Sequence, residues 1–200
     1  MKFWPTTPYQ YGETLETYSQ EIKELAVSLL GFIAMALGLQ GREVSKAFQD
    51  GRYDVRMNCY PPCPEPERVV GGSPHADICA ITFLLDCGDV AGLQVLKDGQ
   101  WVWVKPIAGT LIVDLGTILE IMSNGIYKAN FHRAMVNKCK ERLSVATFCY
   151  PSSNVKIEPA KELVKAGSSP LYKSLTMQEY LQSFYDLKLA ASPFMDTLKL

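Results

Sequence analysis

The chain has 200 residues, of which 48% are hydrophobic and 20% are charged, and its formal net charge is −1. These proportions are typical of a globular protein and exclude the disordered and fibrous classes. Proteins that bind nucleic acid normally carry a basic surface, and 20 lysines and arginines against 21 acidic residues provide no such excess. The composition therefore predicts a globular chain that does not bind nucleic acid.

The first predicted element is a long amphipathic helix. Apolar residues recur there at steps of three and four, as on one face of a helix: Leu15, Tyr18, Ile22, Leu25, Leu29 and Phe32. Thr14 is a candidate start and Gly38 a candidate stop. The uncharged stretch 25–40 is too short to span a membrane, so we expect no membrane segment and interpret the helix as lying on a core.

After a second, shorter helix near residues 41–47, the pattern changes at Tyr53. Short apolar runs separated by turn residues predict strands near 55–59, 78–85, 93–96, 101–104, 110–114, 131–136 and 143–149. Residues 97–100, with Asp98-Gly99 at their centre, predict a hairpin turn, and residues 123–125 predict another turn. Helical spacing returns from Glu162 and again over 176–187. Many short strands favour a sandwich or jelly roll over a parallel sheet.

The six cysteines bear on the compartment of the protein. They are Cys59, Cys63, Cys79, Cys87, Cys139 and Cys149. The first residues of the chain lack the apolar run of a signal peptide, so we expect a cytoplasmic protein with reduced thiols. A zinc site at Cys59 and Cys63 would need a second ligand pair, which the spacing does not provide.

The two histidines of the chain, His75 and His132, are candidate metal ligands. His75 and Asp77 stand two residues apart, and in an extended segment such residues share a face. Two histidines and one carboxylate on one face are the ligand set of non-haem Fe(II) oxygenases. The residues themselves leave open the alternative that both histidines are structural and hydrogen-bonded.

Two further pairs could bind carboxylates. Arg142 and Ser144 lie two apart on a predicted strand and offer a guanidinium fork and a hydroxyl. Asn58 and Tyr60 offer an amide and a phenol in the same way. The alternatives are a surface ion pair for the first and a strand end capped by a proline turn for the second.

A geometric expectation follows if the strands that carry His132 and Arg142 are antiparallel neighbours. A regular pairing would place the two side chains on opposite faces. We therefore expect a bulge or an odd-numbered loop near residues 137–140 that shifts the register by one residue.

Taken together, these segments resemble a known family. The resemblance rests on Asn58-Cys59-Tyr60-Pro61-Pro62-Cys63, His75-Ala76-Asp77, Gly92-Leu93-Gln94-Val95, Ser123-Asn124-Gly125, His132-Arg133 and Arg142-Leu143-Ser144, in that order. The chain is similar to the plant Fe(II)- and 2-oxoglutarate-dependent dioxygenases. Arg56-Met57-Asn58 and residues 97–102 are most similar to the senescence-related and norcoclaurine-synthase-like branch.

The resemblance implies a mainly β fold with flanking helices, namely a double-stranded β-helix (jelly roll) with the long helix packed on it. Residues 1–50 would be a helical remnant of the N-terminal region. Residues 51–200 would form the dioxygenase jelly-roll domain with its C-terminal helices. Members of the family normally carry a longer N-terminal region. We therefore expect uncovered strand edges, with residues 78–85 and 110–114 bordering solvent, and self-association of the chain.

The resemblance also implies a site. His75, Asp77 and His132 would bind Fe(II), and 2-oxoglutarate would chelate the iron, with O2 as the second cosubstrate and ascorbate as reductant. Arg142 and Ser144 would bind the far carboxylate of 2-oxoglutarate, and Tyr60 and Asn58 would hold the near one. Phe148 and Tyr150 would line the substrate pocket.

The implied reaction is oxidation of a small plant metabolite, by hydroxylation, demethylation or desaturation, with release of succinate and CO2. The chain departs from the family pattern at Phe131, Asp114 and Thr117, where an acidic residue, Asn and Asp are usual. Two alternatives therefore stay open. One is a truncated, catalytically silent relative that binds metal or a partner protein, and the other is a non-oxidative lyase or synthase on the same scaffold.

Overall fold

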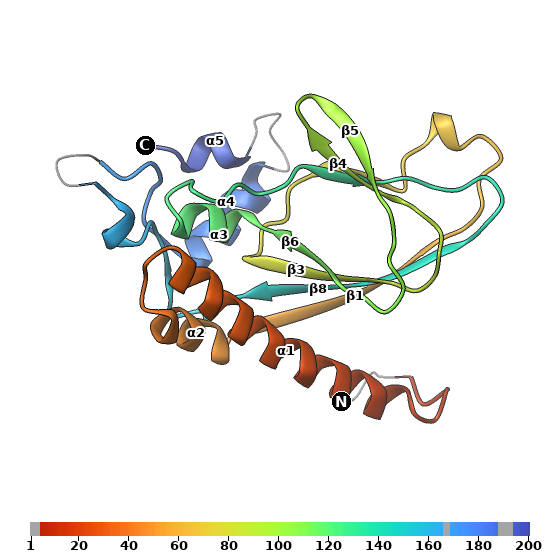
Figure 1. Cartoon of the computed structure of the whole chain (residues 1–200), viewed down its shortest axis with the longest axis horizontal. Helices are drawn as coiled ribbons and strands as arrows, with labels where there is room; N and C mark the ends of the chain where they lie inside the picture. The colour runs from red at the N-terminus through yellow and green to blue at the C-terminus, as the bar shows by residue number, and fades with distance from the viewer. Residues whose placement is uncertain (1–4, 166–168, 188–193) are drawn as a thin grey trace.

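The structure is a computed structural model that describes residues 5–165, 169–187 and 194–200 (Figure 1). Two four-stranded antiparallel sheets dominate it. The first sheet has the order β1-β8-β3-β6, formed by Arg52–Tyr60, Arg142–Tyr150, Ile81–Asp86 and Ile112–Leu115. The second has the order β2-β7-β4-β5, formed by Gly72–His75, His132–Ala134, Leu93–Lys97 and Gln100–Val104. Each sheet mixes early and late strands of the chain, which confirms the predicted jelly roll.

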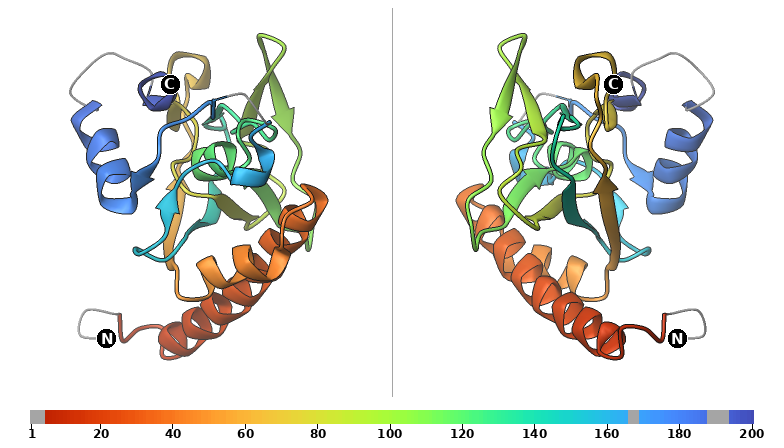
Figure 2. Two further views of the ribbon diagram at one scale, coloured as in Figure 1. Left: turned by 90° about the vertical axis from the view of Figure 1, so that its left-hand side faces the viewer. Right: turned by 90° about the vertical axis from the view of Figure 1, so that its right-hand side faces the viewer.

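The helices occupy two places around the sheets. α1 (Tyr11–Ala36) and α2 (Gly41–Gln49) cover one face of the first sheet, as Figures 1 and 2 show. α3 (Thr117–Met122), α4 (Met177–Leu187) and α5 (Phe194–Leu198) gather at one end of it (Figure 1). The remaining short elements are η1 (Pro66–Arg68), η2 (Lys161–Leu163) and the two-stranded pair β9 (Lys156–Ile157) and β10 (Leu175–Thr176). In the described part of the chain, no helix is both long and apolar enough to cross a membrane.

The long helix begins three residues before Thr14 and ends where predicted, with Gly38 at φ 75°. Its buried face differs from the predicted one beyond Ile22. Leu25 and Phe32 are exposed, and the helix instead buries a row at four-residue steps, Ile22, Ala26, Leu30 and Ala34. The small residues allow close packing: a Cβ on Gly31 would lie 2.4 Å from Ser45 Oγ of α2. The size of the side chains therefore determines which face of α1 is buried, and the spacing of hydrophobic residues alone does not contain this information.

The main core lies between α1, α2 and the outer face of the first sheet, and it continues among α3, α4 and α5 at the end of that sheet. Phe48, Ile81 and Phe83 are fully buried there, and the Tyr18 and Thr147 hydroxyls lie 3.0 Å apart across the helix–sheet boundary. The expectation that residues 78–85 border solvent is therefore wrong for β3, because this strand is flanked by β8 and β6 and covered by the helices. In residues 110–114, Val113 on edge strand β6 is exposed.

Both predicted turns are present. Asp98 (φ 50°) and Gly99 (φ 76°) join β4 to β5, and Asn124 (φ 50°) and Gly125 (φ 77°) follow α3. These positive φ values suit Gly and Asn, and for hairpins the Asp-Gly pair is a preferred sequence. All seven predicted strands exist, with shifted ends.

The expected hairpin between the strands of His132 and Arg142 is wrong. β7 pairs with β2 and β4, whereas β8 pairs with β1 and β3, so the two strands belong to different sheets. The chain between them crosses from one sheet to the other through a turn in which Asn137 Oδ1 accepts hydrogen bonds from the Cys139 and Lys140 backbone. His132 and Arg142 line the same cavity although their strands do not pair, and the register irregularity in the pairing of the strand of His132 lies between Gly72 and His75 of β2.

Candidate functional site

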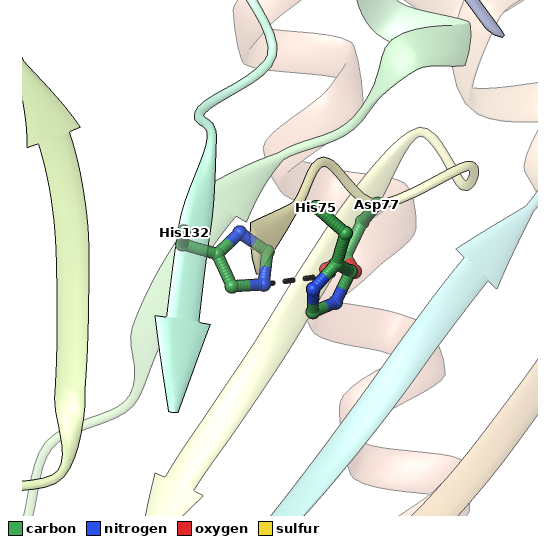
Figure 3. A group of neighbouring side chains, drawn as sticks. All are labelled: His75, Asp77 and His132. Carbon is green, nitrogen blue, oxygen red and sulfur yellow. Dashed lines mark ion pairs between the residues drawn. The ribbon is translucent and has the colours of Figure 1, made fainter. Parts of the chain in front are cut away.

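His75, Asp77 and His132 converge at one end of the space between the sheets. His75 and His132 are cross-strand partners on β2 and β7, and Asp77 follows β2 (Figure 3). Asp77 Oδ1 lies 3.5 Å from His75 Nε2 and 3.8 Å from His132 Nε2. One potential ligand atom from each residue lies within 4.8 Å of the others, so a single metal ion can contact all three.

Each histidine ring is fixed through its Nδ1 atom. His75 Nδ1 lies 2.7 Å from the Ser73 carbonyl and His132 Nδ1 lies 3.1 Å from the Asn130 carbonyl. A carbonyl only accepts hydrogen bonds, so each Nδ1 carries a proton, and a neutral ring then keeps a lone pair on Nε2. Both Nε2 atoms face Asp77, as metal binding requires.

Two carboxylates shape the electrostatics of this cluster. Burial would raise the pKa of Asp77, but when the two rings are protonated the hydrogen bond from His75 and the charge of His132 outweigh burial, and the pKa of Asp77 is lowered. Burial would lower the pKa of His132, but the hydrogen bond to Asp114 and the charge of Asp77 raise it. Asp114 Oδ2 is 3.0 Å from His132 Nδ1, and Thr82 donates to Asp77 Oδ2 at 2.5 Å. The Asp77 carboxylate is therefore ionised and available to a cation.

A cavity of about 480 Å³ extends from the three residues along the inner face of the first sheet. The sequence-predicted carboxylate binders lie on this face in two cross-strand pairs, Asn58 with Ser144 and Tyr60 with Arg142. All four line the cavity, and the Arg142 guanidinium lies 5.4 Å from the centre of the Tyr60 ring. The predicted i, i+2 relation on each strand thus holds, and pairing of β1 with β8 brings the two pairs together.

Of the two predicted pocket residues, Phe148 lines this cavity. Tyr150 does not: its ring is packed in the core, and the Arg52 guanidinium lies 4.4 Å from its centre. Tyr150 ends β8 beyond the reach of the cavity, because the core closes over this end of the sheet.

Three further residues lie near the site: Asp114 was noted from the sequence only as a departure from the family pattern, and Thr82 and Asp86 were not predicted. Thr82 and Asp114 contact the triad directly, and Asp86 forms an ion pair with Arg142 at 2.5 Å. Thr82 and Asp86 lie on β3 and have even numbers, as do the cavity-facing residues of that strand. Recognising Asp86 needs the pairing of β3 with β8, which is a contact between distant segments, whereas recognising Thr82 needs the bend that returns the chain to Asp77.

The donor set fits a ferrous ion and a 2-oxo acid. Two imidazoles and one carboxylate would leave coordination positions of the ion free for a ligand, and the His75 side chain is 52% exposed. Arg142 Nε and Ser144 Oγ are buried and have no hydrogen-bond partner in the described residues. Unsatisfied buried donors beside a cavity are suited to a ligand carboxylate.

Comparison with known proteins finds plant relatives that match nearly the whole chain. The chain is 41% identical over 199 residues to Protein SRG1 of Arabidopsis thaliana, covering 98% of this chain and 56% of that protein. It is 40% identical over 196 residues to an oxoglutarate-dependent flavonoid 7-O-demethylase of Ocimum basilicum, covering 98% of this chain and 53% of that enzyme.

Among solved structures, JOX2 in complex with 2OG, Fe and JA superposes with a TM-score of 0.85 at 38% identity. That match covers 90% of this chain and 54% of JOX2. The chain therefore spans about half the length of the relatives that it matches.

The sequence profile of the 2OG-Fe(II) oxygenase superfamily matches residues 52–151. This segment contains the three converging side chains, both four-stranded sheets and Arg142. Half of the chain thus follows the profile, and the relatives described above extend the similarity over nearly all of it. The chain belongs to the 2OG-Fe(II) oxygenase superfamily.

Proposed function

We propose that this chain is the site-bearing part of an Fe(II)- and 2-oxoglutarate-dependent oxygenase. The observation that carries the proposal is the convergence of His75, Asp77 and His132 at the end of a cavity that also contains Arg142 and Ser144. Bound iron with 2-oxoglutarate and O2 would supply oxidative chemistry that releases succinate and CO2.

The residues of the chain bind and orient the reactants. His75 and His132 offer Nε2 lone pairs and Asp77 offers Oδ1, while Thr82 holds the other carboxylate oxygen in place. Arg142 and Ser144 would bind the far carboxylate of 2-oxoglutarate, with Asn58 and Tyr60 beside them on β1. The protein thus contributes orientation and exclusion of water, and the reactive chemistry comes from the metal and the cosubstrate.

The proposed substrate is a small plant metabolite with apolar or aromatic character. A cavity of about 480 Å³ suits a small molecule, and Phe148, Leu84 and Ile112 give it apolar walls. The similarity to a flavonoid demethylase supports oxidation of such a compound, by hydroxylation, demethylation or desaturation. Ascorbate is the proposed reductant.

We propose a cytoplasmic location. All six cysteines are free thiols, as is usual in a reducing compartment. Self-association of the chain through exposed strand edges stays a prediction, and size-exclusion chromatography with light scattering would check it.

The proposal is tested by iron binding and by succinate release. Anaerobic titration with Fe(II) is expected to show one tight site that is lost in His75→Ala, Asp77→Ala and His132→Ala, because each change removes one of three ligands. An exposed control, Lys199→Ala, is expected to bind iron like the parent.

With O2, 2-oxoglutarate and ascorbate, the parent is expected to release succinate and the three variants are not. Unchanged iron affinity in any ligand variant would overturn the site. Tight iron binding without succinate release, with or without candidate substrates, would instead identify a catalytically silent relative.

A further inference from the structure

A carboxylate of the protein itself lies at the arginine that should receive the cosubstrate. Asp86 Oδ1 is 2.5 Å from Arg142 Nη2, and the two side chains are 8% and 4% exposed. Arg142 is the only buried basic residue in the part of the chain that the structure describes. Its charge is therefore already neutralised before any ligand carboxylate arrives.

Strand pairing fixes this arrangement. Asp86 ends β3 and is the cross-strand partner of Ser144, whose other partner is Asn58 on β1. Asp86 thus shares the inner face of the first sheet with the proposed cosubstrate binders. Gly92 packs against the stem of Arg142, where a Cβ would lie 2.4 Å from Arg142 Cδ. This close contact limits how far the guanidinium can turn away from Asp86.

The contact is an ion pair that lacks hydrogen-bond geometry. Both carboxylate oxygens of Asp86, Nε and Nη2 of Arg142 and Oγ of Ser144 are buried without a hydrogen-bond partner in the described residues. A carboxylate that positions an arginine normally accepts hydrogen bonds from its fork, often two in parallel. A buried ion pair is stabilising only when its remaining donors and acceptors are satisfied. The pair therefore does not have the features of a completed structural salt bridge.

We propose that Asp86 is an internal competitor of ligand carboxylates at Arg142 and so determines which 2-oxo acids the site accepts. This inference rests on the proposed function. With a ligand carboxylate bound, two buried carboxylates would share one guanidinium, and like charges brought together without water repel strongly. Asp86 therefore weakens binding of 2-oxo acids with a charged far end and has little effect on those with an uncharged far end.

The experiment compares two five-carbon 2-oxo acids, 2-oxoglutarate and 2-oxopentanoate, which differ in the far carboxylate. Binding to the Fe(II)-loaded chain is measured anaerobically by calorimetry, so no turnover is needed. Asp86→Asn removes the charge and keeps the shape, and Asp86→Glu keeps the charge. Asp89→Asn is the matched control, because Asp89 is 84% exposed in a surface pair with Lys140.

Asp86→Asn is expected to bind 2-oxoglutarate at least about tenfold more tightly than the parent, as removal of one like-charge contact in a desolvated site implies. Its affinity for 2-oxopentanoate is expected to be unchanged. Asp86→Glu and Asp89→Asn are expected to bind 2-oxoglutarate as weakly as the parent. If the parent binds both ligands, weaker 2-oxoglutarate binding by Asp86→Asn would show that Asp86 positions Arg142. Equal binding would show that Asp86 does not oppose the ligand. Either result would overturn the inference and leave the proposed function standing.

A measurement on the parent covers the case in which Asp86→Asn does not fold. The parent is expected to prefer 2-oxoglutarate over 2-oxopentanoate by less than about tenfold, since Asp86 offsets the charge of Arg142. A preference above about a hundredfold would overturn the inference, because Arg142 would then be fully available to the ligand. If iron binds but neither 2-oxo acid binds to any form, the proposed function itself fails, and the inference with it.

Discussion

His132 and Asp114 are the residues whose relation matters most at the scale of single side chains. Asp114 Oδ2 lies 3.0 Å from His132 Nδ1, and Asp114 Oδ1 accepts a hydrogen bond from Asn130 at 2.8 Å. A carboxylate behind a ligating histidine fixes the orientation of its ring and raises its basicity. Among the residues that the structure describes, His75 has only the Ser73 carbonyl in this role, so we expect the two rings to depend on their surroundings to different degrees.

Asp114→Ala is therefore expected to weaken Fe(II) binding by about 10- to 100-fold, the usual cost of losing such a partner. Asp114→Asn, which keeps a hydrogen-bond acceptor, should lose less. Anaerobic metal titration measures both, with exposed Asp196→Ala as the control. Equal affinities for the parent and Asp114→Ala would show that Asp114 does not position His132.

The two buried thiols give a prediction about which cysteines an alkylating reagent modifies. Burial raises the pKa of Cys149 to about 12, and burial raises that of Cys79 well above its usual value. Because only the thiolate reacts, iodoacetamide at pH 8.5 is expected to leave both unmodified in the folded chain and to modify exposed Cys87 and Cys139. Protection should disappear in denaturant. Peptide mass spectrometry reads the sites, and native-state labelling of Cys149 at the rate of Cys87 would contradict the burial.

At the scale of elements, the junction of β6 and α3 supports the segment that carries Asp77. The backbone N–H groups of Gly116, Thr117 and Ile118 donate to the carbonyls of Ala80, Asp77 and Cys79 at 2.8–3.1 Å. A Cβ on Gly116 would lie 2.1 Å from the Cys79 carbonyl oxygen. The glycine is thus required by a close approach of two backbones beside a metal ligand.

Gly116→Ala is expected to lower the free energy of unfolding by about 2–4 kcal/mol, because backbone must move to make room. It should also weaken iron binding by displacing Asp77. Gly88→Ala is the matched control: nothing lies within 4 Å of its Cβ position, and we expect a change below about 0.5 kcal/mol. Chemical denaturation measures both, and equal stabilities of the two variants would refute the packing argument.

The elements also show which parts of the fold are predictable. The strands that were predicted alternate in polarity or run apolar, and this is a local property of the sequence. β2 was missed because Gly-Ser-Pro-His has the composition of a turn, and it becomes a strand only by pairing with β7. The expected β7–β8 hairpin was wrong for a related reason: sequence adjacency favoured it, whereas pairing across the sandwich decides the partners.

The candidate site likewise has local features that the sequence predicts and contacts that depend on the folded chain. The i, i+2 pairs on single strands were predictable, since a strand places such residues on one face. Asp86 was not, because it acts through Arg142 on a distant strand. Thr82 was missed because its contact with Asp77 depends on the bend between them, and Asp114 was noted only as a departure from the family pattern, without its contact to His132. Tyr150 was misplaced since the end of the cavity depends on packing of the core.

For the whole molecule, the site connects the two sheets. His132 belongs to a strand of the second sheet, and Asp77 lies on the connection from that sheet to β3 of the first. Across the cavity, Arg142 and Ser144 belong to the first sheet. An ion held by all three ligands therefore restrains the segment at which the chain passes from one sheet to the other, and metal binding should stabilise the fold as a unit.

Fe(II) at about 100 times its dissociation constant is expected to raise the Tm of the chain by about 5–11 °C. The shift is expected because the ion binds the folded state and not the unfolded state, so the free energy of binding adds to the free energy of unfolding. Differential scanning fluorimetry under nitrogen measures it, with His132→Ala as the variant that should show no shift. An equal shift in that variant would place the stabilising ion elsewhere.

Tyr180 connects α4 to this same region. Its hydroxyl donates to the Ile78 carbonyl at 2.8 Å and lies 2.5 Å from Thr117 Oγ1, and the side chain is fully buried. A side chain without a hydroxyl here would remove a hydrogen-bond partner from the buried Thr117 hydroxyl and from the part-buried Ile78 carbonyl, next to a ligand-bearing segment. Position 180 should therefore accept few substitutions, although it contacts none of the proposed reactants, and deep mutational scanning should rank it among the least tolerant positions of α4.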